Sequence, residues 1–470
     1  MTSGDAAGER LYVPASGTFD EAISGDGTAR PHARASLAQV AATPGAAARD
    51  MATQCRDRGV VFNSYRGSEE LLIDPLPRVI PAAEFALLEA GLIQRVEALD
   101  AFVDDVYGAR TVIAEGVVPE RVVSSADHYD PDAARHRPPG GTWIGVAGLD
   151  VVRGADGELV VLEDNVRTPS GFAYALAARE LVEEQFPRLD DAELPRPIDH
   201  GLELLADTLA QAAPESAGDD PYIALLSDGP DNSAWWEHSL LSERLGIALV
   251  VADDLELAGD ELRHDGSRVD VVYRRTDACS TDSWVGELLG VAVRAGTLGL
   301  VNGFGTGIGD DKLVHAYVED LIRFFCGAEP LLSSVKTFDL MRPEQLEEVV
   351  DRCAELVIKP RGGAGGVGVV ICPHADPGDV EVARQAIREE PSAFIAQELV
   401  MLSTHPTVVG DRLVPRHVDL RPFVYMGRDR DAQVVPGGLT RVAFDEGALV
   451  VNSSQNGGVK DTWVLATTGH

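Results

Sequence analysis

A glycine-rich stretch, residues 356–372 with the sequence LVIKPRGGAGGVGVVIC, restricts the possible folds of this chain more than any other segment. Two apolar runs of β-type residues flank the glycines, and Lys359 closes the first run, which predicts a hairpin with a flexible tip. Backbone N–H groups of such a tip can approach phosphate oxygens closely, and a lysine adds a positive charge for the same anion. The stretch therefore predicts a cover over a triphosphate, with candidate contacts at Lys359, Gly362, Gly363, Gly365 and Gly366.

Two other glycine motifs fit these residues less well. The loop contains G-x-G-x-x-G, but β-branched residues and Pro373 follow it, whereas a dinucleotide site requires a helix there. It also fits the protein-kinase loop, yet the lysine precedes the glycines and the H-R-D and D-F-G motifs are missing. A tight glycine turn on a surface hairpin is the remaining alternative.

A second informative stretch, residues 142–171, predicts another antiparallel hairpin. Apolar runs around 144–152 and 159–162 are separated by a Gly- and Asp-containing turn. Asp150 lies on the first run, and Glu163, Asp164 and Asn165 close the second. Strand alternation places Glu163 and Asn165 on one face and Asp164 on the other. Oxygen donors converging from a hairpin favour Mg²⁺, although a polar strand end is an equally simple interpretation.

The length of 470 residues suggests two to three domains. We expect a loosely ordered segment over 1–58, a helical layer over 59–135 with one long helix at 82–107, and the metal-binding hairpin within 136–215. Residues 216–300 alternate between strand and helix patterns, which predicts a small doubly wound α/β unit, and 301–470 hold the glycine hairpin and further strands. The predicted class is mixed α+β and α/β.

Polar and basic residues lie at the ends of several predicted strands. The chain has only four lysines, Lys312, Lys336, Lys359 and Lys460. The strand at 393–400 ends in Gln397 and Glu398, which suit a purine edge and a ribose. Cations inside the C-terminal strands favour a phosphate-binding floor. Its candidate residues are Arg421, Arg441, Asn452 and Lys460, and Arg275 ends a strand of the small α/β unit.

Composition excludes several classes of partner. The net charge of −36 disfavours nucleic acid and anionic lipid, and no apolar run is long enough to span a bilayer. The N-terminus lacks the pattern of a secretory signal, so we expect a cytoplasmic protein with no membrane partner. The five cysteines form no C-x-x-C pair, which argues against zinc and disulfides.

These motifs together resemble the ATP-grasp ligases. The similar segments include VLEDNVRTPSGFAYAL, GTGIGDDK, PRHVDLRPF and VNSSQNGGVKDTWVL, between about residues 60 and 465. In ordinary ATP-grasp enzymes the E-x-N hairpin follows the glycine loop, but here Glu163 and Asn165 precede Lys359. The chain therefore resembles the circularly permuted type 2 ATP-grasp family and is similar to glutathionylspermidine synthase in its ATP site. Residues 136–215 and 301–470 would then form one domain, with 216–300, the pre-ATP-grasp unit, between them in sequence.

The resemblance implies a role for each candidate. Asp150, Glu163 and Asn165 would bind Mg²⁺, for which Mn²⁺ can substitute, and Lys312 and Lys359 would contact ATP. The adenine hinge would comprise Gln397, Glu398, Leu399 and Val400. Arg421 and Arg441 would contact phosphate or acyl phosphate. One departure is Val367, where the family often has an aromatic residue.

The resemblance also implies the reaction: Mg-ATP-dependent ligation of a carboxylate to an amine through an acyl phosphate, with release of ADP and phosphate. The substrates would be small molecules or peptides whose identity the sequence does not reveal, and a homo-oligomer is compatible with it. Two alternatives stay open, a nucleotide-binding scaffold without turnover and an ATP-dependent phosphotransferase.

Overall fold

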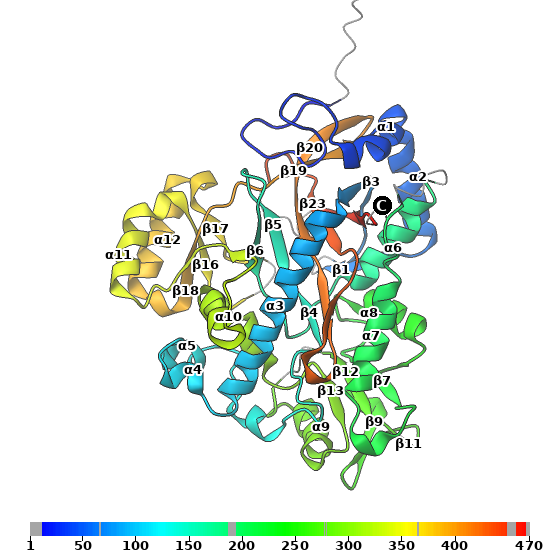
Figure 1. The fold of residues 1–470 in the computed structure, drawn as a ribbon, viewed down its shortest axis with the longest axis vertical. Helices are drawn as coiled ribbons and strands as arrows, with labels where there is room; N and C mark the ends of the chain where they lie inside the picture. The colour runs from blue at the N-terminus through cyan, green and yellow to red at the C-terminus, as the bar shows by residue number, and fades with distance from the viewer. Residues whose placement is uncertain are drawn as a thin grey trace, which may run out of the picture.

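The computed structural model describes residues 12–64, 67–186, 194–276, 278, 280–363, 366–448 and 457–466. Its centre is a mixed eight-stranded sheet that assembles strands from the N-terminal, middle and C-terminal parts of the chain (Figure 1). The strand order is β14 (Ser333–Ser334), β6 (Leu159–Glu163), β5 (Asp150–Arg153), β20 (Arg412–Arg421), β23 (Leu439–Ala443), β24 (Gly457–Val464) and β3 (Ile73–Ile80), with β19 (Thr404–Val409) paired to β20.

The predicted metal hairpin is confirmed as a hairpin. β5 and β6 pair antiparallel with Asp150 opposite Glu163, although the first apolar run is divided into β4 (Val146–Gly148) and β5. β5 also pairs with β20, where Val151 lies opposite Leu420. Strands about 270 residues apart are therefore neighbours in one sheet, as the permuted arrangement requires.

The glycine-rich stretch forms the expected hairpin in a separate lobe. β16 (Leu356–Pro360) pairs antiparallel with β17 (Val370–Ile371) and with β18 (Phe394–Glu398), and β15 (Thr337–Phe338) completes this four-stranded sheet. Helices α11 (Pro343–Arg352) and α12 (Pro377–Glu389) cover one face (Figure 1). We call this lobe, residues 337–398, the lid.

The small α/β unit is also observed. Its sheet is parallel, in the order β13 (Gly299–Val301), β12 (Val271–Arg275), β7 (Ile223–Ser227) and β8 (Ala248–Val250). Helices α8 (Trp235–Leu245) and α9 (Trp284–Ala295) accompany it, and β9 (Leu255–Ala258), β10 (Glu261–His264) and β11 (Ser267–Arg268) add a small antiparallel sheet. Because β13 completes the parallel sheet, this unit extends slightly beyond residue 300.

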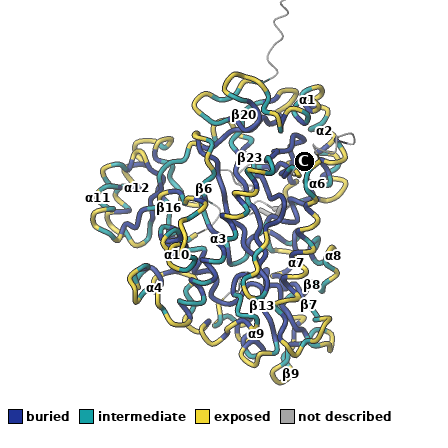
Figure 2. The backbone as a smooth tube through the Cα atoms, viewed as in Figure 1, coloured by how far each residue is buried: buried dark blue, intermediate teal, exposed yellow. Residues whose placement is uncertain are grey.

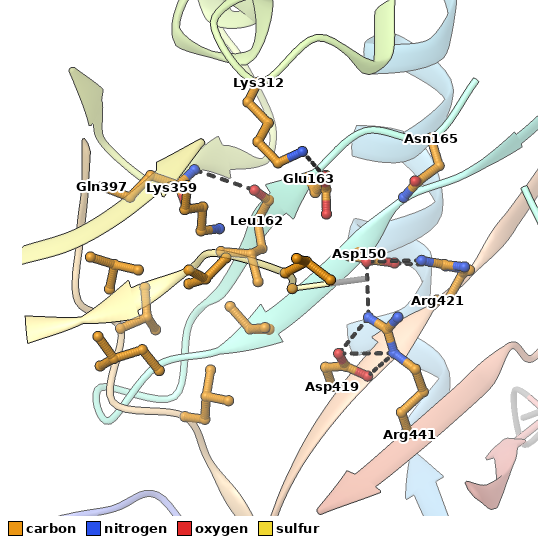
Figure 3. A pocket seen from close by; sticks show the side chains of 18 of the residues that line it. Asp150, Leu162, Glu163, Asn165, Lys312, Lys359, Gln397, Asp419, Arg421 and Arg441 are labelled. Atoms are coloured by element: carbon orange, nitrogen blue, oxygen red, sulfur yellow. Dashed lines mark hydrogen bonds and ion pairs between the residues drawn. The ribbon is translucent and has the colours of Figure 1, made fainter. Parts of the chain in front are cut away.

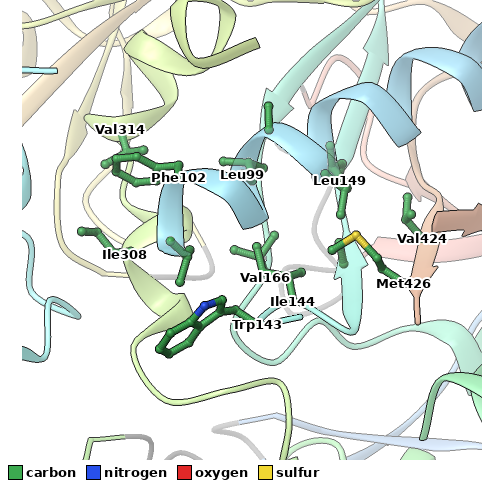
Figure 4. Packing of buried hydrophobic residues seen from close by; sticks show 14 of the residues in the cluster. Leu99, Phe102, Trp143, Ile144, Leu149, Val166, Ile308, Val314, Val424 and Met426 are labelled. Carbon is green, nitrogen blue, oxygen red and sulfur yellow. The ribbon is translucent and has the colours of Figure 1, made fainter. Parts of the chain in front are cut away.

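The long helix expected at 82–107 is α3 (Ala82–Val106), and it packs across the central sheet (Figure 1). Its apolar positions recur at helical spacing, so one face is fully buried. Leu99 and Phe102 belong to one buried cluster with Trp143, Ile144 and Val166, and Phe102 lies beside Val314 (Figure 4). Buried chain follows the sheets, whereas the outer surfaces of the lid helices are exposed (Figure 2).

The remaining named elements surround these layers. The shorter helices are α4 (Thr111–Ala114), α5 (Glu120–Ser124), α6 (Phe172–Glu183), α7 (His200–Gln211) and α10 (Val318–Cys326). β4 joins β21 (Phe423–Met426) and β22 (Ala432–Val434), and β1 (Val61–Ser64) pairs with β2 (Gly67–Glu70). Across the described ranges, every helix is too short or too polar to cross a membrane.

The expectation of loose order over 1–58 is wrong for the part that the structure describes, which starts at residue 12. Helices α1 (Arg34–Ala42) and α2 (Pro44–Asp57) occupy much of it. Glu21 is buried and its carboxylate accepts two hydrogen bonds of 2.7 Å from Arg78. This ion pair with β3, together with buried apolar residues such as Val40, Met51 and Cys55, fixes the segment against the rest of the fold.

Candidate active site

A cavity of about 450 Å³ lies between the lid hairpin and the central sheet (Figure 3). Three separated parts of the chain supply its walls: β5 and β6 with the segment that follows, the loop that carries Lys312, and the lid with the C-terminal strands. The candidates that line it are Asp150, Glu163, Asn165, Lys312, Lys359, Gly362, Gly363, Gly366, Gln397, Glu398, Leu399, Val400, Arg421 and Arg441. Residues predicted from distant motifs are therefore brought into one cavity.

One end of the cavity is apolar and lies at the end of β18. Leu162, Val357, Ile371, Val400 and Leu402 line it. A slot of this kind accommodates a flat ring, and the fixed polar groups around it set the orientation of that ring.

Gln397 supplies such a group at the apolar end. Its Nε2 donates to Thr337 Oγ1 at 2.9 Å, while its Oε1 is buried and has no hydrogen-bond partner within the described ranges. A free acceptor beside an apolar slot suits an amino group on a heterocycle. Glu398 is less available than expected, because its two oxygens each accept a hydrogen bond of 2.9 Å from Arg352.

Two lysines face the middle of the cavity. Lys312 Nζ donates to the carbonyl oxygen of Gly363 at 2.7 Å and lies 3.4 Å from Glu163 Oε1, so it connects the lid to the metal hairpin. Lys359 forms neither a hydrogen bond nor an ion pair with any described residue, and its side chain points into the cavity (Figure 3). Burial lowers the pKa of Lys359 and the charge of Lys312 adds to this effect, against the opposing charges of Glu163 and Asp150. A cation held without a counter-ion at this position favours an anionic ligand.

The opposite end of the cavity holds a charged cluster of two carboxylates and two guanidinium groups (Figure 3). Arg421 binds Asp150 through Nε and Nη2 at 2.7 and 2.9 Å. Arg441 lies 2.9 Å from Asp150 and also binds Asp419, with Nη2 to Oδ2 at 2.6 Å. Both arginines are thus held on carboxylates rather than presented to open space.

The arginines lower the pKa of both carboxylates, but the net shifts are opposite. Burial would raise the pKa of Asp150, but Arg421 and Arg441 outweigh burial and lower it to about 2. Burial raises the pKa of Asp419, against the opposing effect of Arg441. Two positive and two negative charges balance here, so the unpaired Lys359 leaves the cavity with an available positive charge.

Adjacent residues at the end of β6 point to opposite faces, as strand alternation predicted. Glu163 and Asn165 line the cavity, and the side chain of Glu163 is 33% exposed. Asp164 is 1% exposed and binds the buried Arg95 through two hydrogen bonds of 2.6 and 2.7 Å. His315 Nδ1 lies 2.8 Å from the same carboxylate. Asp164 is therefore part of a buried ion pair and not part of the cavity wall.

The donors around Asp150 and Glu163 fit a magnesium ion that also binds phosphate. Both residues line the cavity from paired positions, although Arg421 and Arg441 already contact the Asp150 oxygens. The Asn165 amide faces the same cavity, and its buried Nδ2 has no partner among the described residues. Among the described residues, His, Cys, Asp and Glu side chains nowhere form a group of three able to hold a metal by themselves. One or two carboxylates supplemented by ligand oxygens is the usual arrangement for Mg²⁺.

Two predicted site residues lie elsewhere. Lys460 is fully buried, and its Nζ contacts Asp74 Oδ1 at 2.5 Å and the carbonyl oxygen of Pro406 at 3.0 Å. Arg275 is buried against Glu237, with Nη2 to Oε1 at 3.0 Å, and does not line the cavity. Lys460 and Arg275 each form a buried ion pair within the protein, so the prediction that they contact a ligand is corrected. Gly365 and Asn452 fall outside the described residues.

Sequence reasoning assigned no role to two residues that hold the site together, Asp419 and Arg361. Asp419 lies two residues before Arg421 on β20, and that spacing on one strand face was a usable signal. Arg361, at the base of the glycine tip, binds Asp311 at 2.9 Å and donates to the carbonyl oxygen of Val122 at 2.7 Å. It joins the lid to the Lys312 loop and to α5, contacts between segments that no local pattern indicates.

Comparison with known proteins places these features in a family context. The family described as "Circularly permuted ATP-grasp type 2" matches residues 77–443. A protein of Frankia casuarinae named "Putative glutamate--cysteine ligase 2-2" is 42% identical over 95% of this chain and 53% of its own length. An uncharacterized protein of Mycobacterium leprae is 39% identical over 95% of this chain and 82% of its own length. The chain thus spans about half the length of the Frankia relative.

A solved structure shares the fold at low identity. It is a glutathione synthetase-like effector of Globodera pallida in the apo form, with a TM-score of 0.59 and 12% identity. The alignment covers 90% of this chain and 97% of the effector. This likeness concerns the fold alone.

Proposed function

Because this chain belongs to the circularly permuted ATP-grasp type 2 family, we propose that it is a Mg-ATP-dependent carboxylate–amine ligase. The reaction forms an amide or peptide bond through an acyl phosphate and releases ADP and phosphate. The substrates are a small-molecule or peptide carboxylate and an amine.

The observation that carries this proposal is the unpaired Lys359 at the base of a glycine lid, facing Glu163 and Asp150 across one cavity. Lys359 is half-buried, and an ammonium withdrawn from water without an ion-pair partner favours an anion that binds there. The apolar slot and the free acceptor of Gln397 lie at one end of the same cavity, so an adenine ring there would direct its phosphates toward the lysines. A single nucleotide accounts for all these features.

Residues in different parts of the cavity would have different roles. Lys312 and Lys359 would bind the phosphates, and Asp150, Glu163 and Asn165 would hold Mg²⁺, which supplies charge neutralisation when bound. Arg421 and Arg441 stand next to the metal ligands, where a carboxylate and a developing phosphate need positive charge. The glycine tip lies over the cavity and would exclude water from an acyl phosphate.

The name of the Frankia relative does not define the substrates of this chain. That protein is nearly twice as long as the segment it shares with this chain, and the Mycobacterium leprae relative, which matches over most of its length, has no assigned activity. Glutamate and cysteine should therefore be tested as substrates together with other carboxylates and amines.

The experiment combines the purified chain with Mg-ATP and a protein-free small-molecule extract, and measures ADP, phosphate and new masses. The expected result is a product with the mass of two consumed compounds minus water, formed in equal amount to ADP. A phosphorylated product that persists would indicate a phosphotransferase instead, and nucleotide binding without ADP release would indicate a scaffold. Lys359→Ala should abolish turnover. Lys336→Ala is the matched control, because Lys336 is exposed and does not line the cavity. Its contact with Glu398 is long, at 3.8 Å, and Arg352 already holds both oxygens of that carboxylate.

A further inference from the structure

A second cleft, of about 630 Å³, lies beside the nucleotide cavity and takes no part in the roles assigned above. Its walls come from the segment after α5, the segment between β12 and α9, and the loop before Lys312. The segment after α5, cyan in Figure 1, passes below the lid toward α9. The lining residues are Asp127, His128, Tyr129, Asp130, Pro131, Asp132, Arg167, Arg274, Ser280, Thr281, Asp282, Gly305 and Gly307. Its volume and its position beyond the carboxyl end of a parallel strand are typical of small-molecule sites.

The cleft shares a wall with the nucleotide cavity. A Cβ atom added to Gly362, which lines the nucleotide cavity, would lie 2.4 Å from Asp127 Oδ2. A Cβ atom on Gly307 would meet both His128 and Arg167, at 2.8 and 2.9 Å. Arg167 follows Asn165 by two residues, so the chain that carries the proposed metal ligand continues directly into the cleft. A molecule bound here would be separated from the nucleotide cavity by the wall at Gly362 and Asp127.

Two charged groups on this shared wall are available to a ligand. Arg167 has a buried Nε without a hydrogen-bond partner, and its contact with Asp310, at 3.8 Å, is long. The Oδ1 atom of Asp310 is already used by the backbone N–H groups of Val166 and Arg167. Asp127 makes no hydrogen bond or ion pair with any residue in the described ranges. Partial burial and the charge of Arg167 lower the pKa of His128, against the opposing charge of Asp127.

Other charged groups of the cleft are already satisfied. Asp130 accepts hydrogen bonds from the backbone N–H and the hydroxyl of Thr281, at 2.7 and 2.9 Å. Arg274 donates to the carbonyl oxygens of Asn302 and Gly303, both at 2.9 Å. The Arg167 guanidinium and the Asp127 carboxylate therefore line one cleft without forming an ion pair with each other.

We propose that this cleft binds the amine co-substrate, and that this co-substrate is an amino acid or short peptide whose ammonium contacts Asp127 and whose carboxylate contacts Arg167. The inference rests on the proposed ligase function. A polyamine would satisfy Asp127 but would place a second positive charge against Arg167. A ligand with both an ammonium and a carboxylate satisfies both groups, and its amine lies at the edge of the glycine lid.

Equilibrium dialysis with mass spectrometry tests the proposal directly and without turnover. The full chain is dialysed against a pool of the twenty L-amino acids and simple dipeptides, and separately against the corresponding decarboxylated amines with spermidine. We expect at least one member of the first pool to be retained, with its decarboxylated counterpart bound at least tenfold more weakly. Asp127→Asn and Arg167→Gln should each weaken retention at least tenfold. Glu120→Gln, which changes an exposed carboxylate paired with Arg110 outside the cleft, should not.

ATP binding by the same variants separates this inference from the proposed function. If ATP binds normally and no amino acid or dipeptide is retained, or if both variants retain the ligand as the unchanged chain does, the cleft is not the co-substrate site. Retention of spermidine or of the decarboxylated amines alone also overturns the inference. Failure of ATP to bind, with the amino acid still retained, would instead refute the ligase and leave the cleft as a binding site.

Discussion

Single substitutions of the neighbouring residues Glu163 and Asp164 should have different effects: one should lower turnover and the other should lower the free energy of unfolding. Asp164→Asn removes the only carboxylate that the structure shows in an ion pair with Arg95, whose guanidinium is fully buried. Breaking a buried ion pair by removing one partner costs about 3–5 kcal/mol, because the other charge stays buried without compensation. Asparagine keeps one acceptor for Arg95, so we expect a value near the lower limit.

Glu163→Gln should behave in the opposite way. The Glu163 side chain is 33% exposed and lies 3.4 Å from Lys312, a contact that contributes at most about 1 kcal/mol to stability. Its loss should leave the unfolding midpoint almost unchanged and remove Mg²⁺-dependent turnover, since the metal acts most strongly on charge that develops during transfer.

The assay is urea unfolding of both variants, followed by Mg-ATP turnover per folded molecule. We expect a clearly lower midpoint for Asp164→Asn, with turnover retained in the remaining folded fraction. An unchanged midpoint for Asp164→Asn together with lost turnover would refute the assigned faces of the strand end. Full turnover by Glu163→Gln would remove Glu163 from the metal site.

Four further results are expected. Lys359→Ala should weaken ATP binding about 10- to 100-fold in calorimetric titration without lowering stability, because it removes a charged contact to ligand but none to protein. Lys460→Met should lower stability by about 3 kcal/mol or more while ATP affinity of the folded protein is retained, since its partner Asp74 stays buried and unpaired. Arg361→Ala should loosen the lid, which limited proteolysis within the glycine tip would detect, and Arg361→Lys should restore part of the protection. Burial would raise the pKa of Glu21, but two arginines outweigh burial and lower it from 4.5 to about 2. The stabilisation by Glu21 is therefore present above pH 4.5 and lost as the pH falls through about 2. The stability of Glu21→Gln should not change with pH over this range, which acid unfolding of both proteins would measure.

Local hydrophobic periodicity was sufficient to predict the two hairpins and the long helix. The two hairpins and the long helix are confirmed because their strand or helix patterns extend over adjacent residues. The alternation at the end of β6 also separated Glu163 and Asn165 from Asp164 correctly. These properties depend on which side of a local element each residue faces, so the sequence contains them directly.

Lys460 shows where such reasoning fails. It lies on β24, which is buried along nearly its whole length, so alternation does not distinguish a face toward the cavity from a face toward the core. A rare lysine on a strand fits a phosphate contact and a buried ion pair equally well. Its partner, Asp74, is 386 residues away on β3, and only the pairing of these two strands brings the charges together.

By itself, the sequence determined the two hairpins, their order along the chain, and hence the permuted family to which they belong. The tertiary structure decided which charges remain free. Lys359 has no ion-pair partner among the described residues, whereas Arg421 and Arg441 are held on Asp150 and Lys460 is held on Asp74. The physical reason is that the state of a charge depends on its neighbours within a few ångströms. For strands hundreds of residues apart, the register of the assembled sheet selects those neighbours.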